Sequence, residues 1–237
     1  MQLFEGDCLE VMKTLPPESV DLVLCDLPYG TTQNKWDTVI PFVPLWAEYE
    51  RLARKEAGFV FTASQPFTSQ LVMSKLSWFK YEWVWRKNTA TGHLNAKRMP
   101  MKLHENVIVF AKSSCSYFPQ GLQPYGKLTR RGGNGGNFGV SGAENFQEWT
   151  NYPRSILDFS LDTDKLHPTQ KPLALMEYLV RTYTKVGDVV LDNCMGSGTT
   201  GVACIKTGRQ FIGIVQDPKY FQLAKSRIDE ALAEWCI

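Results

Sequence analysis

Short apolar runs alternate along the chain with stretches in which apolar residues recur at helical spacing. The runs Val20–Cys25, 188–191 and 209–217 predict strands, and the first is typical of a strand buried on both faces of a sheet. Asp217 is the expected N-cap of a helix that begins at Pro218. Two amphipathic helices should cover the sheet, one through Leu173, Met176, Leu179, Val180 and Tyr183 and the other through Tyr220, Ala224, Ile228 and Leu232. This alternation predicts an α/β fold.

The middle of the chain departs from this pattern. Residues 81–85 and 106–111 predict further strands, and the alternating aromatic residues of the first indicate packing in the core rather than a base-stacking ladder. Turn formers dominate residues 113–155. We therefore expect a single domain over 1–237 that carries an insertion at 113–160.

Composition narrows the class of protein only slightly. With 237 residues the chain can build a full core. It contains no stretch near the length of a membrane span and no signal peptide pattern at its N-terminus, so we expect a cytoplasmic protein that does not bind membranes. The six cysteines suggest neither a disulfide framework nor a zinc site, and no metal is expected. Because the formal net charge is only +2, binding to nucleic acid would need a local basic patch.

Asp26, Pro28 and Tyr29 follow directly on the run Val20–Cys25, where a buried strand meets its loop. Ligands of α/β sheets bind at the carboxyl ends of the strands, so Asp26 is expected at the binding edge. Pro28 stops the strand and leaves neighbouring carbonyls free to accept hydrogen bonds, while Tyr29 supplies a stacking face. These groups suit a flat base that bears an amino group. The alternative is an ordinary turn with a solvated acid.

A second pattern lies in the segment 188–201, where an apolar run leads to Asp192 and a glycine-rich turn then opens a helix. Gly196 and Gly198 let the backbone approach a ligand closely, and the amides at the start of the helix favour a polar or anionic group. The next run, 209–217, ends in another acid. This unit of strands and helices predicts a site for a nucleoside-like cofactor.

Two cofactors compete for this unit. Gly196, Gly198 and Gly201 match the fingerprint of a dinucleotide site, with Asp217 as the acid for the ribose. A NAD fold, however, continues through several strands after the fingerprint, and few residues follow Gly201. Asp192, at the strand end, also suits an amino or hydroxyl group better than a pyrophosphate. These features favour S-adenosylmethionine over NAD.

Three separated motifs occur in an order that is typical of one family. They are Asp-Leu-Pro-Tyr from Asp26, His-Pro-Thr-Gln-Lys-Pro from His167, and the glycine-rich turn from Asp192 to Thr200. With them the chain resembles the β-class DNA amino-methyltransferases, and in particular small phage and prophage adenine methyltransferases. The resemblance implies a Rossmann-like methyltransferase fold with a permuted motif order, a mixed seven-stranded sheet and helices on both faces, plus a small target-recognition insertion.

The resemblance also implies a reaction, in which a site-specific enzyme transfers a methyl group from S-adenosylmethionine to N6 of an adenine flipped out of duplex DNA. Asp26 and a carbonyl of Leu27 or Pro28 would accept hydrogen bonds from the amine and aim its lone pair at the methyl group. Tyr29 would stack on the base. Asp26 would not be a strong base, because the proton leaves after methyl transfer has made the nitrogen acidic. Such an enzyme would act in a bacterial or phage-infected cell, as in restriction-modification.

Cofactor-binding residues are implied in the same way. Asp7 and Cys8 are assigned to the adenine ring, and Lys171 and Asp192 to the methionine end. The full set of expected cofactor-binding residues is Asp7, Cys8, Asp26, Lys171, Asp192, Met195, Gly196, Ser197, Gly198, Thr199, Thr200, Val215, Gln216 and Asp217. Each also has a structural interpretation; Asp7 can cap or turn the chain, and Cys8 can be a small core residue.

One position departs from the family pattern. Where relatives usually carry a Glu that holds the ribose hydroxyls, this chain has Val215, which cannot accept a hydrogen bond. Asp217 is a better replacement than Gln216, because the alternation of a strand puts Gln216 on the opposite face. Losing a charged acceptor predicts a cofactor affinity that is lower by roughly ten- to a hundredfold.

Basic residues in the middle of the chain are candidates for the DNA surface. Lys97 and Arg98 lie between two predicted strands, and Lys127, Arg130 and Arg131 precede a glycine-rich run. The functional interpretation places them on phosphates, with one arginine on a guanine edge. The alternative is a flexible surface loop with solvated charges. Because the segment is short, we expect either a small recognition site or a homodimer that supplies more DNA surface.

Two other functions stay open. An N4-cytosine methyltransferase also methylates an exocyclic amine, although the cytosine enzymes of the family more often have Ser at the position of Asp26. A DNA-binding relative with an impaired cofactor site is suggested by Val215. Intact Asp26, Pro28, Tyr29 and 196–200 argue against that loss of activity.

Overall fold

The computed structural model describes residues 1–34, 37–130, 144–163 and 170–235. The chain divides into two compact units, a larger one formed by Met1–Phe118 with Ser155–Ile237 and a smaller one formed by Pro119–Arg154. Over the part of the chain that is described, none of the helices combines the length and the apolar character needed to cross a membrane.

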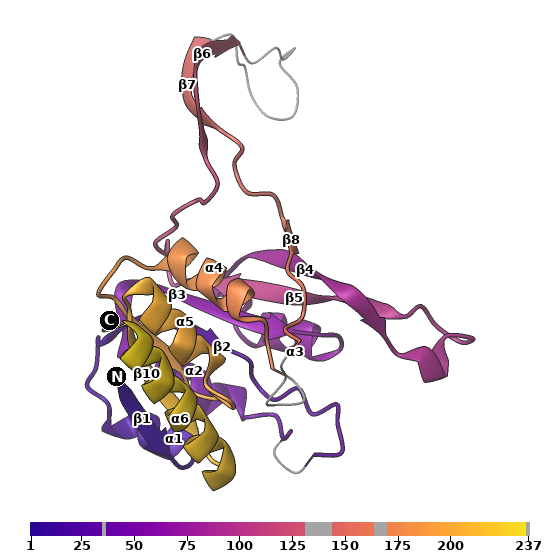
Figure 1. The fold of residues 1–237 in the computed structure, drawn as a ribbon, viewed down its shortest axis with the longest axis vertical. Coiled ribbons are helices and arrows are strands. Elements are labelled where there is room, and N and C mark those ends of the chain that lie inside the picture. Colours follow the sequence, from indigo (N-terminus) through magenta and orange to yellow (C-terminus); the bar gives the residue numbers. More distant parts are fainter. Residues whose placement is uncertain (35–36, 131–143, 164–169, 236–237) are drawn as a thin grey trace. The chain divides into compact units, whose positions relative to one another are not determined.

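The larger unit is built on one mixed sheet (Figure 1). Counted over the described residues, the sheet has eight strands in the order β1-β10-β9-β2-β3-β5-β4-β8. All pairings in it are parallel except those that β5 makes with β3 and β4. The strands are β1 (Gln2–Glu5), β2 (Val20–Cys25), β3 (Ala53–Ala63), β4 (Phe79–Thr91), β5 (Lys102–Phe110), β8 (Ile156–Asp158), β9 (Val189–Asp192) and β10 (Gln210–Val215).

The sheet therefore has one strand more than the seven expected. At its edge lies the short strand β8, whose Ile156 pairs with Val84 of β4. A three-residue strand is too short to produce a recognisable alternation, and this one follows the segment in which turn formers dominate. Periodicity could not have indicated it.

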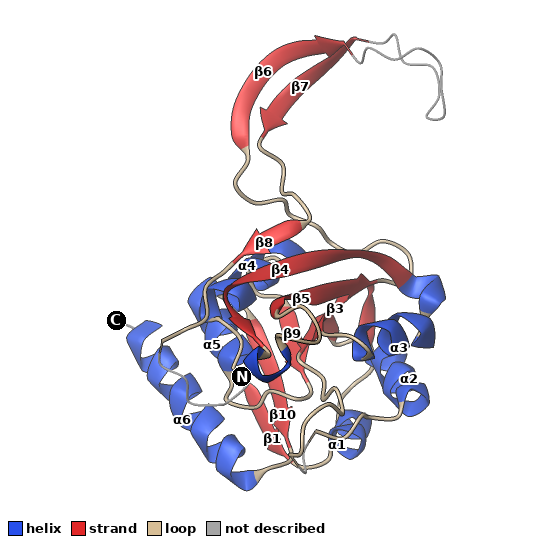
Figure 2. Ribbon diagram, turned by 90° about the vertical axis from the view of Figure 1, so that its right-hand side faces the viewer, coloured by secondary structure: helices blue, strands red, loops and turns tan. Residues whose placement is uncertain are grey.

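Helices cover both faces of the sheet (Figure 2). One face packs against α4 (Leu173–Tyr183), α5 (Thr199–Thr207) and α6 (Pro218–Trp235), and the other against α1 (Cys8–Thr14), α2 (Phe42–Leu52) and α3 (Phe67–Ser74). The alternation of β2 divides its side chains between the two cores, with Leu22 and Leu24 in the first and Val23 and Cys25 in the second. Two short 3-10 helices, η1 (Leu76–Trp78) and η2 (His93–Asn95), complete the described helical elements.

The parallel strands place their carboxyl ends at one edge of the sheet, which we call the carboxyl edge. Asp26 follows β2 there, and Asp192 ends the neighbouring strand β9. On the far side of β9, β10 ends at Val215, beside the end of β1 at Glu5. The topology thus gathers the ends of four strands, which is the arrangement that forms ligand sites in α/β sheets.

Several sequence predictions are confirmed at this level. Helix α6 begins at Pro218, and the Asp217 side chain caps it by accepting hydrogen bonds from the amides of Lys219 (2.8 Å) and Tyr220 (3.3 Å). The strands expected at 81–85 and 106–111 are parts of β4 and β5, although Ala111 itself lies just outside β5. Trp83 and Trp85 are buried, so the aromatic alternation is core packing.

The smaller unit lies inside the insertion expected at 113–160. Its described part is a two-stranded antiparallel sheet of β6 (Gln123–Arg130) and β7 (Glu144–Thr150), in which Leu128 pairs with Phe146. Both of these side chains are exposed. A role of this unit in target recognition stays a prediction.

Helix α5 packs so closely that it requires glycine at position 201. A Cβ there would lie 2.6 Å from Cδ1 of Ile228 and 2.8 Å from Cε1 of Phe211. We predict that Gly201→Ala lowers the free energy of unfolding by about 1–3 kcal/mol through overpacking. Denaturant unfolding would measure this change. Gly58→Ala is the matched control, since a Cβ at that buried strand position would meet Cys115 Cβ at an ordinary 3.4 Å, and an equal loss for both variants would contradict the prediction.

Candidate active site

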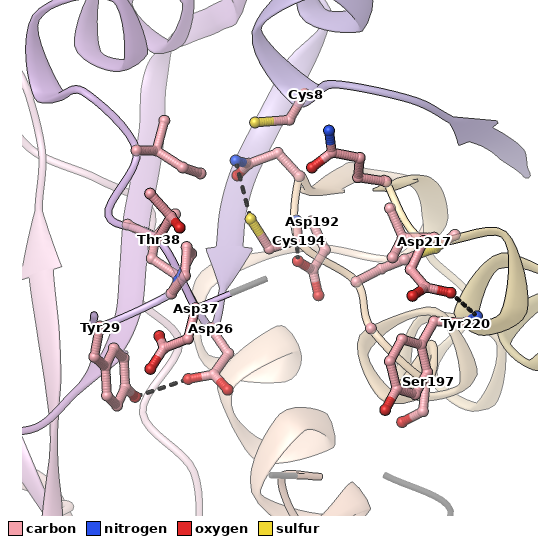
Figure 3. A pocket seen from close by; sticks show the side chains of 18 of the residues that line it. Cys8, Asp26, Tyr29, Asp37, Thr38, Asp192, Cys194, Ser197, Asp217 and Tyr220 are labelled. Carbon is pink, nitrogen blue, oxygen red and sulfur yellow. Dashed lines mark hydrogen bonds between the residues drawn. The ribbon is translucent and has the colours of Figure 1, made fainter. Parts of the chain in front are cut away.

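A cavity of about 410 Å³ opens at the carboxyl edge (Figure 3). Its walls come from the ends of β1, β2, β9 and β10 and from the loops that follow them. The residues that line it lie in the segments 6–9, 26–29, 31–32, 37–41, 170–171, 192–197, 199–200 and 215–217, together with Met176 and Tyr220. Cavities of this size are typical of small-molecule and cofactor sites.

The carboxylate of Asp26 accepts three hydrogen bonds from side chains around the cavity. Its Oδ1 accepts from the hydroxyl of Tyr29 at 2.7 Å and, in a short hydrogen bond, from the hydroxyl of Thr62. Its Oδ2 accepts from Nζ of Lys171 at 2.5 Å. An ionised carboxylate offers about four acceptor positions, so three donors hold the group in one orientation and, among the residues that the structure describes, leave a position free on Oδ2.

Lys171 bridges two carboxylates. Besides Asp26, its Nζ lies 3.6 Å from Oε2 of Glu105, and the Lys171 side chain is only 9% exposed. Burial alone would lower the pKa of Lys171, but the attraction of Asp26 and Glu105 outweighs it and raises the pKa. Lys171 is therefore a permanent cation against Asp26.

Tyr29 faces the same carboxylate. Burial and the neighbouring charge of Asp26 raise the pKa of its phenol well above the ordinary value, so the hydroxyl stays protonated and donates. One side of its ring stacks on Phe67, with a centroid distance of 5.1 Å and an interplanar angle of 23°. The ring orientation is thus set by packing as well as by the hydrogen bond.

The loop after Tyr29 is ordered by Asp37. The two oxygens of its buried carboxylate accept hydrogen bonds from the amides of Gly30, Thr31 and Thr32, at 2.7–2.9 Å. Although burial opposes it, these hydrogen bonds lower the pKa of Asp37. Asp37 therefore stays ionised and holds one wall of the cavity.

Asp192 ends β9 with its carboxylate inside the protein. It accepts hydrogen bonds from the hydroxyl of Thr200 at 2.6 Å and from the amide of Cys194 at 3.1 Å, and the residue is 3% exposed. Burial raises the pKa of Asp192 to about 6, and the nearby negative charge of Asp26 acts in the same direction. A cation that entered the cavity would stabilise the ionised form.

The turn that follows Asp192 is anchored to the core by a hydrogen bond to a buried tyrosine. Asn193 accepts a hydrogen bond of 2.6 Å from the hydroxyl of Tyr49, which is completely buried. Gly196 and Gly198 adopt positive φ angles of 48° and 78°, which L-residues with side chains rarely adopt. Gly198 is the N-cap of α5 and packs on α6 near Ala224, so its role in the structure is to form the turn rather than to line the cavity.

The far end of the cavity is formed by the ends of β1 and β10. The amide of Gly6 donates to the carbonyl of Val215 at 3.1 Å, which closes this end of the sheet. Asp7 caps α1 by accepting from the amides of Leu9 and Glu10, and it also lines the cavity. Asp7 can therefore cap α1 and line the cavity at the same time.

Cysteine thiols line the cavity as neutral groups. A hydrogen bond with Cys194 and burial both raise the pKa of the Cys8 thiol, and the pKa of Cys194 is also raised, first by its hydrogen bond with Cys25. Burial raises the pKa of Cys25 to about 12. Thiolates are the reactive form of cysteine, so this cluster is not a source of nucleophiles.

The cavity gathers almost all of the residues expected to bind a cofactor. Each of them except Gly198 lines it, and so do Pro28 and Tyr29. The residues expected to bind DNA lie elsewhere: Lys97 and Arg98 are exposed between β4 and β5, and Lys127 and Arg130 belong to β6 of the smaller unit. Arg131 and residues 164–169, which include His167, lie outside the described residues. The individual ligand roles stay predictions.

Sequence reasoning missed the polar groups that surround Asp26. Thr62 on β3, Glu105 on β5 and Lys87 on β4 share one face of the sheet with it, and a short ion pair joins Lys87 to Glu105. A signal was available. In each of these strands every second residue points to this face, and the polar residue is the next in that series after one or two buried apolar residues. The series are Leu22, Leu24 and Asp26 in and after β2, Val60 and Thr62 in β3, Trp83, Trp85 and Lys87 in β4, and Val109, Val107 and Glu105 in β5.

A doubly covered, mostly parallel sheet with its cavity at the carboxyl edge defines a Rossmann-like protein with a site for a cofactor. A sequence profile of the DNA methylases, of the N6/N4 methyltransferase type, matches residues 20–226. The chain belongs to this DNA methylase family. The family predicted from the three motifs is thereby confirmed, and with it a DNA methyltransferase that uses S-adenosylmethionine, whereas closeness to phage enzymes stays a prediction.

Known proteins agree with this placement. The chain is similar to the DNA adenine methyltransferase YhdJ of Escherichia coli K12, with 29% identity over 97% of this chain and 83% of YhdJ. It is 25% identical to the type II methyltransferase M.HinfI of Haemophilus influenzae, over 96% of this chain and 68% of that protein.

Solved structures share the fold. The crystal structure of an M1.HpyAVI–S-adenosylmethionine complex has a TM-score of 0.65 and 26% identity, and the match covers 95% of this chain and 98% of that one. The cytosine-N4-specific PvuII DNA methyltransferase has a TM-score of 0.71 at 15% identity, over 98% and 91% of the two chains. The latter likeness concerns the fold alone. The predicted fold class is confirmed.

The raised pKa of Asp192 predicts a measurable dependence of stability on pH. Because the folded state binds this proton more tightly than the ordinary value of 3.8 allows, the contribution of Asp192 to stability is largest below about pH 4 and is lost as the pH rises through about 6. In Asp192→Asn this dependence should disappear. Thermal unfolding of the free protein between pH 4 and 8 would test it, with the exposed Asp229→Asn as control. A difference between wild type and Asp192→Asn that is constant with pH would refute the prediction.

Proposed function

We propose that this protein transfers a methyl group from S-adenosylmethionine to N6 of adenine in duplex DNA. The observation that carries the proposal is the orientation of Asp26 at the cavity, where three protein donors hold its carboxylate and, among the described residues, one acceptor position is left unused. An exocyclic amine is the kind of group that can donate to this position. Among the curated relatives, YhdJ carries the name of a DNA adenine methyltransferase.

The cavity fits the cofactor. Asp192 is a buried carboxylate that faces it and suits the ammonium of the methionine part, and the turn at Gly196 gives access to backbone without a side chain. Asp7, Cys8 and Val215 at the other end suit a neutral ring and its ribose. When bound there, S-adenosylmethionine supplies an electrophilic methyl group on a sulfonium sulfur.

The protein contributes orientation and charge to the transfer. The adenine amine is a poor nucleophile because its lone pair is delocalised into the ring. Hydrogen bonds from its N–H groups to Asp26 and to a carbonyl of the loop at Leu27 or Pro28 turn the lone pair towards the methyl group. The carboxylate also stabilises the positive charge that develops on the nitrogen, and it accepts the proton once the nitrogen is methylated.

Tyr29 supports the choice of a base as substrate. Its hydroxyl is engaged with Asp26 and one side of its ring with Phe67, so the ring is fixed beside the carboxylate before any ligand arrives. A rigid aromatic ring next to an amine acceptor suits a flat base taken out of the duplex stack. Among methylated amines, the choice of adenine over cytosine rests on Asp26 and on the YhdJ likeness.

The hairpin formed by β4 and β5 is our candidate for a DNA-binding surface. Because β4 runs parallel to β2 across the sheet, its carboxyl end rises past the carboxyl edge, and the hairpin extends as an arm (Figure 1). Near its tip it carries Lys97 and Arg98, with Leu94 fully exposed beside them. Cations there can contact phosphates that flank a base held at Asp26. A homodimer that extends this surface stays a prediction from the family resemblance.

A labelled methyl transfer assay tests the proposed reaction. Wild-type protein, duplex DNA of mixed sequence and methyl-labelled S-adenosylmethionine should give labelled N6-methyladenosine after digestion and separation of nucleosides. Asp26→Ala should lower the rate by at least about a hundredfold, because it removes the acceptor for the amine. Asp229→Ala, which removes an exposed acid of α6, is the control. Label in methylcytosine would instead favour the N4-cytosine reaction, and no label with no cofactor binding would favour a DNA-binding protein.

The proposed DNA surface gives a separate prediction. The double variant Lys97→Ala/Arg98→Ala should weaken binding of duplex DNA by roughly tenfold and reduce the slope of log K against log salt concentration by about 1–2. Fluorescence anisotropy over a salt series would measure both quantities. Lys185→Ala/Lys206→Ala is a matched control, because these exposed lysines precede β9 and β10 at the opposite edge of the sheet. Equal salt slopes for the two double variants would show that the β4–β5 hairpin is not part of the DNA-binding surface.

A further inference from the structure

Four charged side chains form a line away from the cavity. Asp26 contacts Lys171, Lys171 lies between Asp26 and Glu105, and Glu105 is paired with Lys87 through its other oxygen. Negative and positive charges alternate along the line. Of these groups Asp26 and Lys171 line the cavity, whereas Glu105 and Lys87 do not.

The buried position of Glu105 is hard to explain by a contribution to protein stability. Its side chain is 14% exposed, and its Oε2 is buried without a hydrogen bond among the described residues. A buried carboxylate oxygen without a hydrogen bond normally lowers stability. Nζ of Lys171 lies 3.6 Å from that oxygen, whereas Lys87 binds the other oxygen, Oε1. With Oε1 bound by Lys87, the carboxylate of Glu105 turns Oε2 and its negative charge towards Lys171.

Lys171 creates an electrostatic difficulty for the reaction. It helps to orient Asp26, but its positive charge lies next to the place where the amine becomes positive during methyl transfer. Asp26 and Lys171 together carry no net charge, so by themselves they stabilise that cation only weakly. With Glu105 included, the three groups nearest the cavity carry one net negative charge, which is the sign that the transition state requires. Lys87 brings the line of four to neutrality, but Lys171 and Glu105 separate it from Asp26 in the chain of contacts, so its charge acts on the amine more weakly.

We propose that Glu105 is a positioning residue of the transfer reaction, which holds Lys171 against Asp26 and offsets its charge. The inference rests on the proposed function, since it needs an amine that becomes positive at Asp26. It assigns no contact with substrate to Glu105. The effect is electrostatic, and it therefore depends on the sign of the charge that is removed.

Whether the methyl-transfer rate falls or rises when a charge is removed distinguishes this role from a purely structural one. Glu105→Gln removes a negative charge while keeping the shape of the side chain, and the single-turnover rate of methyl transfer should fall roughly tenfold. Lys87→Gln removes a positive charge from the same ion pair, and the rate should stay at the wild-type value or rise. A structural role of the ion pair would lower the rate in both variants. Dissociation constants for cofactor and DNA should change less than about twofold in either.

Glu82→Gln is the matched control. Glu82 lies on β4 beside the same strand β5 but on the opposite face, where it accepts a hydrogen bond from Asn106. Its replacement should leave the rate unchanged. If Glu105→Gln fails to fold, Lys87→Gln/Glu105→Gln removes the ion pair as a whole, and the comparison of its rate with that of Lys87→Gln isolates the Glu105 charge.

The outcomes are distinct. A rate of Glu105→Gln equal to that of wild type, or an equal fall in Glu105→Gln and Lys87→Gln, overturns the inference while the proposed function stands. A fall in Glu105→Gln alone supports it. If wild-type protein transfers no methyl group to DNA, the proposed function itself fails.

Discussion

The parallel pairing of β2 with β9 is the constraint on which the site depends. Leu22 pairs with Val190 and Val23 with Leu191, and this register brings Asp26 and Asp192, which are remote in sequence, to the same edge. The two acids then have different environments: Asp26 is neutralised by Lys171, whereas Asp192 is desolvated and has a raised pKa. One edge thus holds a carboxylate paired with a fixed cation and a second carboxylate that, over the described part of the chain, is buried without one, and the residues around them maintain that difference.

Much of this arrangement could be predicted from the sequence because it follows from strand ends. Asp26, Asp192 and Asp217 each stand where an apolar run stops, and the rule that ligands bind at carboxyl ends is sufficient to bring such residues together. The N-cap of α6 could also be predicted, because Asp217 and the amides it caps are neighbours in the sequence. Val215 at the end of β10 does line the cavity, while its place at the position of a ribose acceptor stays a prediction.

What could not be predicted depends on contacts across strands. Lys171 was expected at the methionine end of the cofactor; it does line the cavity, but its ammonium is held by Asp26 and faces Glu105, which only the register of β3, β5 and β4 reveals. The edge strand β8 was missed because three residues show no period. The smaller unit could be placed as an insertion from its turn formers, but composition does not say that it forms a separate pair of strands.

The sheet also joins strands that lie far apart in the sequence. β1 pairs with β10, with Gln2 opposite Ile212 and Glu5 opposite Val215, so strands that lie about two hundred residues apart in the sequence are neighbours in the sheet. Contacts of such long sequence separation form slowly and cannot form on a ribosome until β10 has emerged. The end of the cavity at Gly6 and Val215 therefore cannot close before β10 is available. A nascent chain can assemble the residues around Asp26, all of which precede β10, before it can close the cavity around a cofactor.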